Sequence, residues 1–368
     1  MKEIEKIVAA YEKAQAANQQ AALATVVEVE GSSYRRTGAR MLIIEDGTWI
    51  GGISGGCLEG DALRKAKSAI MQQKPTLVTY DTREEDQHQI GVGLGCNGLI
   101  KVLVAPIKQE AYHPIKVLKY CSTSRTIQLL ITIALASHHK DLIGTMFTNL
   151  EEMGTALNHS ELMKMLESDV AIAKQKCRSA TVSYRIEEQE WTFFIEILPP
   201  SIHLVLYGGN YDVYPLAQLA KSLGWRVTIV TNLQKAPKMF FEVSDALVSK
   251  QEGLSNFDDF SAIVLMAHDY NTDKANLSQL LPKSIPYVGV LGPKKRTEKM
   301  LRELMEEGVI ITDNMLARLH APIGLDTGAV SPEEIAIAIL AEIRTCFSGR
   351  NGGFLKHRQS PIHERVAD

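Results

Sequence analysis

The second half of this chain of 368 residues repeats one pattern, in which a short apolar segment is followed by a helix-like segment. The apolar segments lack polar alternation, which is typical of strands buried on both faces within a parallel sheet that helices cover. We therefore predict an α/β fold with a doubly wound parallel sheet in this half. The expected strands are residues 202–207, 226–230, 262–266 and 287–290, and the expected helices end near Leu223, Leu281, Glu307 and Phe347.

The last of these helices has a well-marked start. Ser331 is a natural N-cap, Pro332 suits the first helical position, and Glu334 completes a capping box. Ile335, Ile339 and Ile343 then recur at helical spacing, which predicts that one face of the helix packs on a core. Beyond Phe347 the chain becomes polar, and we expect a mobile tail over residues 348–368.

The best linker candidate is Pro199-Pro200-Ser201, because consecutive prolines cannot join a hydrogen-bonded ladder. We therefore expect an N-terminal mixed α/β domain over residues 1–198 and a C-terminal domain over residues 201–347. Within the first domain, residues 109–198 carry no chemical signature and are predicted to be scaffold, with a strand near 127–136, a helix near 161–176 and a strand near 192–198.

Composition excludes several classes of protein. The formal net charge of −3 and the pI near 6.4 lack the basic footprint of a nucleic-acid binder. The apolar runs are shorter than the roughly 20 residues that span a bilayer. The N-terminal segment is amphipathic and lacks the apolar stretch of a signal peptide. The five cysteines form no C-x-x-C pair, so we expect neither a zinc site nor a disulfide framework, but reduced thiols in the cytoplasm.

The first candidate site is the segment Gly51–Glu59, with the sequence GGISGGCLE, which follows an arginine-containing stretch. Glycines let a backbone approach a ligand, and the N–H groups of a helix start attract anions. Cys57 should lie near that helix start, where a thiolate is favoured over a thiol, and the fixed charges of Arg35, Arg36 and Arg40 suit phosphate. A pair of tight turns with a half-buried cysteine explains the same pattern, and the sequence leaves both interpretations open.

A second glycine cluster, Gly91–Gly98, presents Cys96 between Gly95 and Asn97. Its glycines alternate, but a strand-like segment follows where a dinucleotide fingerprint requires a helix. This excludes nicotinamide binding by the loop. A loop that presents a second cysteine and a structural hairpin both remain possible interpretations.

The third glycine cluster follows the first strand of the C-terminal half and begins at Gly208-Gly209. Asn210 and Val213 replace two glycines of the Rossmann fingerprint, and the next strand ends at Thr231-Asn232 without an acid to bind a ribose. We therefore do not expect NAD binding by this Rossmann-like domain.

His268-Asp269 follows another predicted strand, at the carboxyl edge where open α/β sheets bind ligands. A histidine satisfied by a nearby carbonyl is the simpler alternative for a single residue. The charged run Lys294-Lys295-Arg296 is typical of a solvated helix face rather than of a site.

Together these motifs resemble the xanthine dehydrogenase accessory factor family (XdhC/CoxI), which serves molybdenum hydroxylases. The matching segments are Gly31–Met41, Gly51–Glu59, Gly95–Gly98, His268–Asp273, Tyr287–Arg296, Pro322–Gly328 and Ser331–Ile335. The chain departs from the family pattern at Tyr34, where proline is usual, at Asn210 and Val213, and at Thr231. The last three departures argue against nucleotide binding and leave the cysteine motifs intact.

The resemblance implies a protein that binds molybdenum cofactor (molybdopterin), carries it rather than uses it, assists its sulfuration and hands it to the apo-enzyme of a xanthine dehydrogenase-type hydroxylase. It also implies a cysteine desulfurase as a second partner, and base rates favour a homodimer. The residues predicted to bind the cofactor are Arg35, Arg40, Ser54, Gly55, Gly56, Cys57, Glu59, Gly95, Cys96, His268 and Asp269. Molybdenum is thiophilic, so Cys57 and Cys96 are the predicted metal ligands.

Two other classes of function stay open at this point. One is an NAD(P)-dependent oxidoreductase that uses the C-terminal domain, and the broken glycine turn argues against it. The other is a structural component permanently attached to a dehydrogenase.

Overall fold

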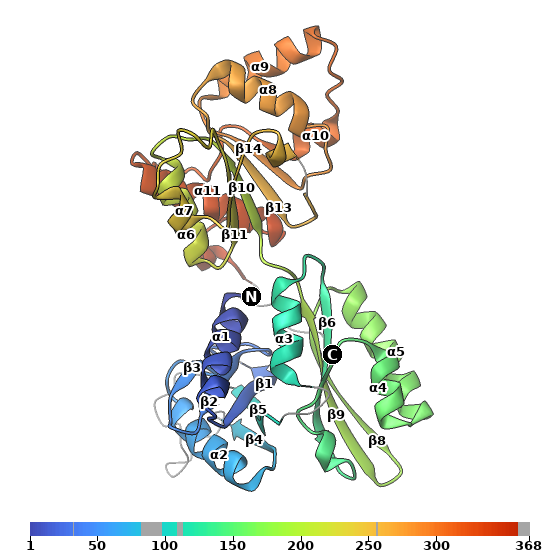
Figure 1. Ribbon diagram of the computed structural model, residues 1–368. Helices are drawn as coiled ribbons and strands as arrows, with labels where there is room; N and C mark the ends of the chain where they lie inside the picture. The colour runs from blue at the N-terminus through green and yellow to red at the C-terminus, as the bar shows by residue number, and fades with distance from the viewer. Residues whose placement is uncertain (32, 82–97, 109–112, 255–256, 360–368) are drawn as a thin grey trace. The chain divides into compact units, whose positions relative to one another are not determined.

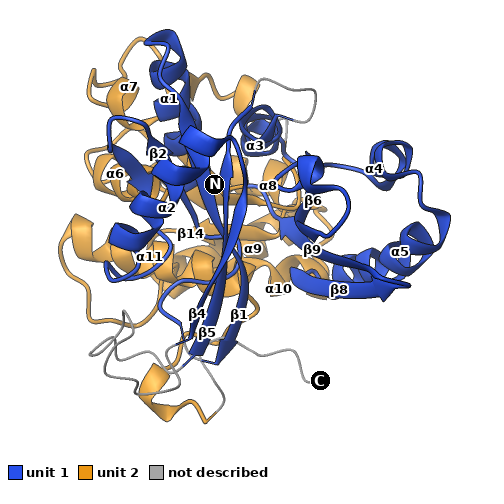
Figure 2. Ribbon diagram, turned by 90° about the horizontal axis from the view of Figure 1, so that it is seen from below, with its two compact units in different colours: residues 1–200 blue, residues 201–368 orange. Residues whose placement is uncertain are grey.

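The computed structural model describes residues 1–31, 33–81, 98–108, 113–254 and 257–359. The chain divides into two compact units, Met1–Pro200 and Ser201–Asp368 (Figure 2). The boundary between the units falls inside the segment Pro199-Pro200-Ser201.

The first unit begins with an antiparallel five-stranded sheet in the order β3-β2-β1-β5-β4 (Figure 1). Its strands are β1 (Ala21–Gly31), β2 (Arg40–Ile44), β3 (Trp49–Gly51), β4 (Thr76–Asp81) and β5 (Gly98–Pro106), and its helices are α1 (Lys2–Ala16) and α2 (Glu59–Gln72). Successive side chains of β1 point to opposite faces of the sheet. Leu23 packs with α1 and Ala24 packs with α2, so each face of the sheet is covered by one of these helices.

Residues 113–198 contribute a second antiparallel sheet, in the order β7-β6-β9-β8. Its elements are α3 (Pro114–Thr123), β6 (Gln128–Ala136), η1 (Lys140–Leu142), β7 (Met146–Phe147), α4 (Leu150–Leu157), α5 (Ser160–Gln175), β8 (Ala180–Ile186) and β9 (Gln189–Leu198). Helices α4 and α5 share a core with one face of this sheet (Figure 1). Ala134 and Phe194 pack against Val27 and Leu103 of the first sheet, which joins the two sheets in one unit.

The two predicted strands and the predicted helix of this segment correspond to β6, β9 and α5. Strand β8 was not predicted from the sequence. It lies at the edge of its sheet with largely half-exposed side chains, so its pattern lacks the continuous apolar run of a buried strand.

The second unit is built on a six-stranded parallel sheet in the order β12-β11-β10-β13-β14-β15, which confirms the predicted doubly wound fold. Its strands are β10 (His203–Tyr207), β11 (Arg226–Val230), β12 (Ala246–Val248), β13 (Ser261–Leu265), β14 (Tyr287–Val290) and β15 (Leu319–His320). The chain runs outward from β10 to β12 and then returns to the other side of β10 as β13. The switch point of the sheet, where such folds bind ligands, is therefore the carboxyl edge between β10 and β13.

Helices cover both faces of this sheet. They are α6 (Val213–Ser222), α7 (Phe240–Val243), α8 (Tyr270–Leu280), α9 (Lys294–Glu306), α10 (Asp313–Ala317) and α11 (Pro332–Phe347), with the 3-10 turns η2 (Glu252–Leu254) and η3 (Leu355–His357). One core contains side chains of α6 and α11, and the core on the opposite face contains those of α8 and α9. The predicted capping box of Ser331 and Glu334 is present.

Helix α8 begins five residues earlier than the predicted Ala275. Asp269 caps it by accepting a hydrogen bond from the backbone N–H of Thr272 at 2.8 Å, so the helix begins at Tyr270. The predicted start was wrong because the polar first turn of this helix lacks an apolar periodicity.

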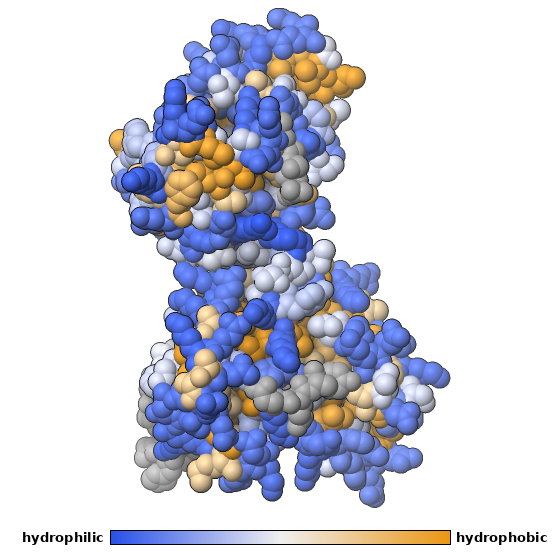
Figure 3. All heavy atoms as spheres, viewed as in Figure 1, coloured by the Kyte–Doolittle hydropathy of each residue, from blue (hydrophilic) through white to orange (hydrophobic). Residues whose placement is uncertain are grey.

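The visible surface is mostly hydrophilic, with separate hydrophobic patches (Figure 3). Within the described parts of the chain, no helix is both long enough and apolar enough to cross a bilayer.

Candidate functional site

The segment Gly51–Glu59 forms the connection from β3 to α2. At Gly51 the backbone has φ of +86°, and an added Cβ would lie 2.3 Å from the carbonyl oxygen of Arg40. Only glycine fits this position without moving the backbone. The hydrogen bond from Gly52 N to the same carbonyl, at 2.9 Å, then holds the chain as it leaves the sheet.

Ser54 and Glu59 fix the shape of this connection. The Ser54 hydroxyl accepts hydrogen bonds from the backbone N–H groups of Gly56, Cys57 and Leu58 at 3.0–3.2 Å, and donates to Glu59 Oε2 at 2.5 Å. Glu59 Oε1 accepts from the backbone N–H of Ser54 at 2.8 Å. The N–H groups predicted to attract an anion are therefore occupied by the Ser54 hydroxyl in this structure.

Cys57 lies at the start of α2, as predicted, and its side chain is exposed. Gly55 and Gly56 beside it are also exposed. The ring of Tyr34 lies against Gly55, where an added Cβ would be 3.3 Å from the ring. The structure therefore brings the arginine-containing loop next to the cysteine loop, with Tyr34 as the contact between them.

Arg35 and Arg40, the two arginines in the predicted cofactor site, have different surroundings. Arg35 pairs with Glu3, and both side chains are about one-third exposed. The guanidinium of Arg40 is buried and pairs with Glu196 of β9, at 3.1 Å for Nη1 and more closely for Nη2. A phosphate could reach Arg40 only if this buried ion pair opened. Arg35 is therefore the accessible cation of the two.

The hydrogen bonds at Glu59 make a pH-dependent contribution to stability. Burial acts to raise the pKa of this carboxyl, but hydrogen bonds from Ser54 and from the backbone N–H of Ile53 outweigh burial and lower it. A carboxylate whose pKa is lowered by folding stabilises the fold above its unfolded pKa, about 4.3, and loses that contribution as the pH falls through the folded pKa.

We expect Glu59→Gln to weaken the start of α2 near neutral pH and to reduce its loss of stability in acid. Hydrogen exchange of the α2 amides, followed by mass spectrometry at about pH 6 and about pH 3, measures both effects. The matched control is Glu306→Gln, which changes an exposed carboxylate in α9. If the variant and the wild type show the same change between the two pH values, the Ser54–Glu59 network does not hold the helix start.

Gly95 and Cys96, the second half of the predicted metal site, lie outside the described residues. Among the residues that the structure describes, no three His, Cys, Asp or Glu side chains group closely enough to hold a metal ion. A pair of sulfur ligands formed by Cys57 and Cys96 stays a prediction.

In the second unit, His268 lies at the predicted carboxyl edge of the sheet. It has φ of +58°, and its Nε2 is 2.6 Å from Oδ2 of Asp212, in the loop after β10. The pair therefore spans the switch point between β10 and β13. The imidazole is half-exposed and Asp212 is largely buried. The second oxygen of Asp212, Oδ1, is buried and has no hydrogen-bond partner among the described residues.

The sequence offered a hydrogen bond to a carbonyl as the simpler alternative for His268. This alternative is wrong, because the partner of the imidazole is the carboxylate of Asp212, which the sequence pattern did not indicate. Asp212 could have been found as the acid that ends the glycine turn after β10. Asp269 caps α8, and hydrogen bonds from Thr272 lower the pKa of its carboxyl.

The prediction that Lys294, Lys295 and Arg296 form a solvated helix face is wrong for Arg296. Its guanidinium donates to the fully buried Asp273 at 2.7 Å, so it does not belong to a solvated face, whereas Lys294 and Lys295 are exposed as expected. Asp273 also accepts from the backbone N–H of Ala267, at 3.1 Å. This ion pair fixes the loop that carries His268.

The turn after β10, in which Asn210 and Val213 replace two glycines of the Rossmann fingerprint, is tightly packed. Asn210 donates to the carbonyl of Ala267 at 3.2 Å, and Val213 is fully buried against Gly208. Asp212 places a carboxylate at the start of α6, where dinucleotide-binding folds hold a pyrophosphate. Two negative groups would repel each other there, which disfavours a dinucleotide at this helix.

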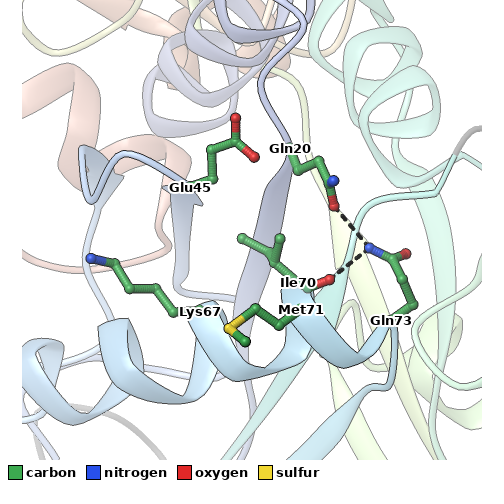
Figure 4. A pocket seen from close by; sticks show the side chains of 6 residues that line it. All are labelled: Gln20, Glu45, Lys67, Ile70, Met71 and Gln73. Atoms are coloured by element: carbon green, nitrogen blue, oxygen red, sulfur yellow. Dashed lines mark hydrogen bonds between the residues drawn. The ribbon is translucent and has the colours of Figure 1, made fainter.

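Two surface hollows of the first unit lie away from the predicted residues. The first, about 360 Å³, is lined by Gln20, Glu45, Lys67, Ile70, Met71 and Gln73 (Figure 4). Gln73 there donates to the side chain of Gln20 at 3.0 Å and to the carbonyl of Ile70 at 2.8 Å. The second, about 560 Å³, lies near β6 and η1. Neither hollow contains a residue predicted to bind the cofactor.

The fold and the loops define a class: a mixed α/β unit with a cysteine-bearing loop, followed by a doubly wound parallel unit. Comparison with known proteins identifies the family that has this architecture. Residues 14–81 match the model of the XdhC and CoxI family, and residues 204–343 match that of the XdhC Rossmann domain. The chain belongs to the XdhC/CoxI family, and the resemblance inferred from the motifs is confirmed.

Individual relatives cover most of the chain. A Bacillus subtilis protein, described as a probable xanthine dehydrogenase subunit, is 32% identical over 88% of this chain and 92% of its own length. The molybdenum cofactor insertion chaperone PaoD of Escherichia coli is 22% identical over 88% of this chain and 82% of its own. A crystal structure described as a xanthine dehydrogenase from Bacillus halodurans has a TM-score of 0.70 and 26% identity, and the match covers 97% of this chain and 98% of that one.

Proposed function

We propose that this protein binds molybdenum cofactor as cargo, assists its sulfuration and delivers it to a hydroxylase of the xanthine dehydrogenase type. The observation that carries the proposal is the exposed Cys57 thiol on a loop whose shape Ser54 and Glu59 fix. The names of two relatives, a cofactor insertion chaperone and a probable xanthine dehydrogenase subunit, support an accessory role for molybdenum enzymes.

The residues of this loop fit one part of the cargo directly. Molybdenum favours soft sulfur ligands, and an exposed thiol on a loop that hydrogen bonds already hold in shape needs little reorganisation when it binds. When bound, the cofactor would supply a thiophilic molybdenum centre, and Cys57 would supply one sulfur ligand. Cys96 is proposed as the second sulfur ligand.

The phosphate of the pterin needs a cation, and Arg35 fits this role better than Arg40. The Arg35–Glu3 pair is partly exposed, and ion pairs of that kind contribute at most about 1 kcal/mol, so a phosphate could replace Glu3. Arg40 is committed to Glu196 in the interior. We therefore propose Arg35 as the phosphate contact and a structural role for Arg40.

His268 and Asp269 are also proposed as cofactor contacts. The carboxylate of Asp212 orients the His268 imidazole. Asp212 Oδ1, which has no hydrogen-bond partner in the described part of the chain, can accept a hydrogen bond from a ligand. We further propose that the protein acts in the cytoplasm as a homodimer, receives sulfur from a cysteine desulfurase, and contains functional domains over residues 1–198 and 201–347.

Anaerobic co-purification followed by molybdopterin analysis tests cargo binding, and activation of an apo-hydroxylase by the loaded protein tests delivery. We expect cofactor to co-purify and the apo-enzyme to gain activity. Calorimetric titration with NAD(H) tests the alternative function, an NAD(P)-dependent oxidoreductase. Micromolar NAD(H) affinity without molybdopterin would instead support an oxidoreductase that uses the second unit.

A further inference from the structure

A group of polar side chains in the second unit, which the proposed function does not use, lies where β15 meets α11. Glu342 of α11 is its centre. It accepts hydrogen bonds from the Tyr287 hydroxyl at 2.5 Å and from the backbone N–H of Gly324 at 2.8 Å, and it lies 3.2 Å from Nδ1 of His320. The Tyr287 and His320 rings stack with their centroids 4.3 Å apart. The imidazole is thus held from one face and one edge.

The other ring nitrogen of His320 faces a thiol. Its Nε2 lies 3.8 Å from Sγ of Cys346, one helical turn beyond Glu342 on α11. Because Nδ1 faces a carboxylate, the proton of the neutral ring belongs on Nδ1, which leaves the lone pair of Nε2 directed at the thiol. Cys346, His320 and Glu342 are therefore arranged in space as a nucleophile, a base and a group that orients the base.

The surroundings keep the thiol neutral at rest. Burial and the charge of Glu342 raise the pKa of Cys346, and the C-terminal end of α11 disfavours an anion. A raised pKa leaves little free thiolate at neutral pH, so reaction requires that His320 Nε2 take the proton from sulfur as the new bond forms, and the thiolate produced in this way is a strong nucleophile.

The arrangement suits exchange at divalent sulfur better than acyl transfer. Acyl transfer needs N–H donors for an oxyanion. The N–H of Gly324, in the loop after β15, is occupied by Glu342. A thiolate leaving group needs only a proton, which His320 can return. Cys346 is exposed, so a substrate can reach it.

We propose that Cys346 is a base-assisted thiol that exchanges with the S–S bond of a persulfide or a disulfide. His320 Nε2 takes the thiol proton as Cys346 Sγ attacks one sulfur of the substrate. A new S–S bond forms, the old one breaks with its electron pair on the departing sulfur, and that thiolate takes the proton from His320. One thiol and one S–S bond are present before and after, so no further oxidant or reductant is consumed. This chemistry goes beyond the proposed function and does not depend on cofactor binding.

The test uses the full chain with glutathione persulfide in one arm and glutathione disulfide in the other, and mass spectrometry of each cysteine peptide. Cys177 is the internal control, since it is also exposed and its thiol contacts a backbone carbonyl rather than an imidazole. We expect Cys346 to react at least about tenfold faster than Cys177 near neutral pH, in line with general-base assistance. If Cys346 gains a sulfur atom with glutathione persulfide and does not react with glutathione disulfide, the substrate is a persulfide. If Cys346 gains glutathione from glutathione disulfide, the substrate is a disulfide. Equal rates at Cys346 and Cys177 in both arms would overturn the proposal.

Variants separate a reactive role from a structural one. We expect His320→Asn to reduce the Cys346 rate to that of Cys177, and Glu342→Gln to reduce it partly. Tyr287→Phe removes another hydrogen bond to Glu342 but leaves the thiol and the base, so its rate should stay within about twofold of wild type. If Tyr287→Phe slows Cys346 as much as His320→Asn does, His320 acts through the fold and not as a base. The unaltered chain decides the proposal even where a variant does not fold.

Discussion

Arg40→Ala is expected to destabilise the first unit by about 3–5 kcal/mol, the cost of leaving a buried charge without its partner. The Arg40 and Glu196 side chains are 2% and 5% exposed, and they join β2 of the first sheet to β9 of the second. Gly38 supports the pair, because a Cβ there would lie 2.5 Å from Glu196 Oε1. Urea unfolding, with hydrogen exchange to locate the loss in the first unit, measures the effect.

The matched control for Arg40 is Arg64→Ala. Arg64 pairs with Asp61 at 3.0 Å, but its side chain is 70% exposed, so its removal should cost less than about 1 kcal/mol. A double variant, Arg40→Met with Glu196→Leu, removes both charges and should recover much of the stability lost in Arg40→Ala. If Arg40→Ala lowers the free energy of unfolding no more than Arg64→Ala does, the Arg40–Glu196 pair does not stabilise the fold, and Arg40 is again a candidate phosphate ligand.

Cys57→Ala is expected to weaken cofactor binding by at least about tenfold, a typical effect of perturbing a metal's surroundings, and to abolish activation of the apo-hydroxylase. The side chain is exposed, so stability should change by less than about 0.5 kcal/mol. Molybdopterin content after anaerobic purification measures binding, and thermal unfolding confirms that the fold is intact.

Cys177→Ala is the control for Cys57, because it removes an exposed thiol from the other end of the same unit's sequence. It should retain full cofactor content. Full binding and activation by Cys57→Ala would show that the loop does not use its thiol, and the proposed ligand would then be wrong. If Arg35 contacts the phosphate, Arg35→Ala should have normal stability, and it should bind the cofactor more weakly than Cys177→Ala but more tightly than Cys57→Ala.

The fold of the second unit was largely predictable from sequence because its strands are continuous apolar runs. The expected strands 226–230 and 287–290 coincide with β11 and β14, and the capping box at Ser331 was readable from three residues. These features depend on local chemistry, namely burial on both sides and hydrogen bonds within one turn. The start of α8 was misplaced because its cap, Asp269, precedes a polar first turn.

The candidate site was predictable in part. The loop with Ser54, Cys57 and Glu59 was identified from its glycines and its cysteine, and the structure places these residues together at the start of α2. The partners that decide which side chains are accessible lie far away in sequence. Glu196 is 156 positions from Arg40, and Asp212 is 56 positions from His268.

By itself, the sequence determined the family, the parallel sheet and the position of the cysteine loop, because glycine spacing, apolar runs and helix caps act over a few residues. Only the tertiary structure decided that Arg40 lies in the interior while Arg35 stays accessible, and that Asp212 holds His268. It alone brought Cys346 to the imidazole of His320. Charge pairing across a folded chain depends on which surfaces meet, and a pattern read along one segment contains no information about its distant partner.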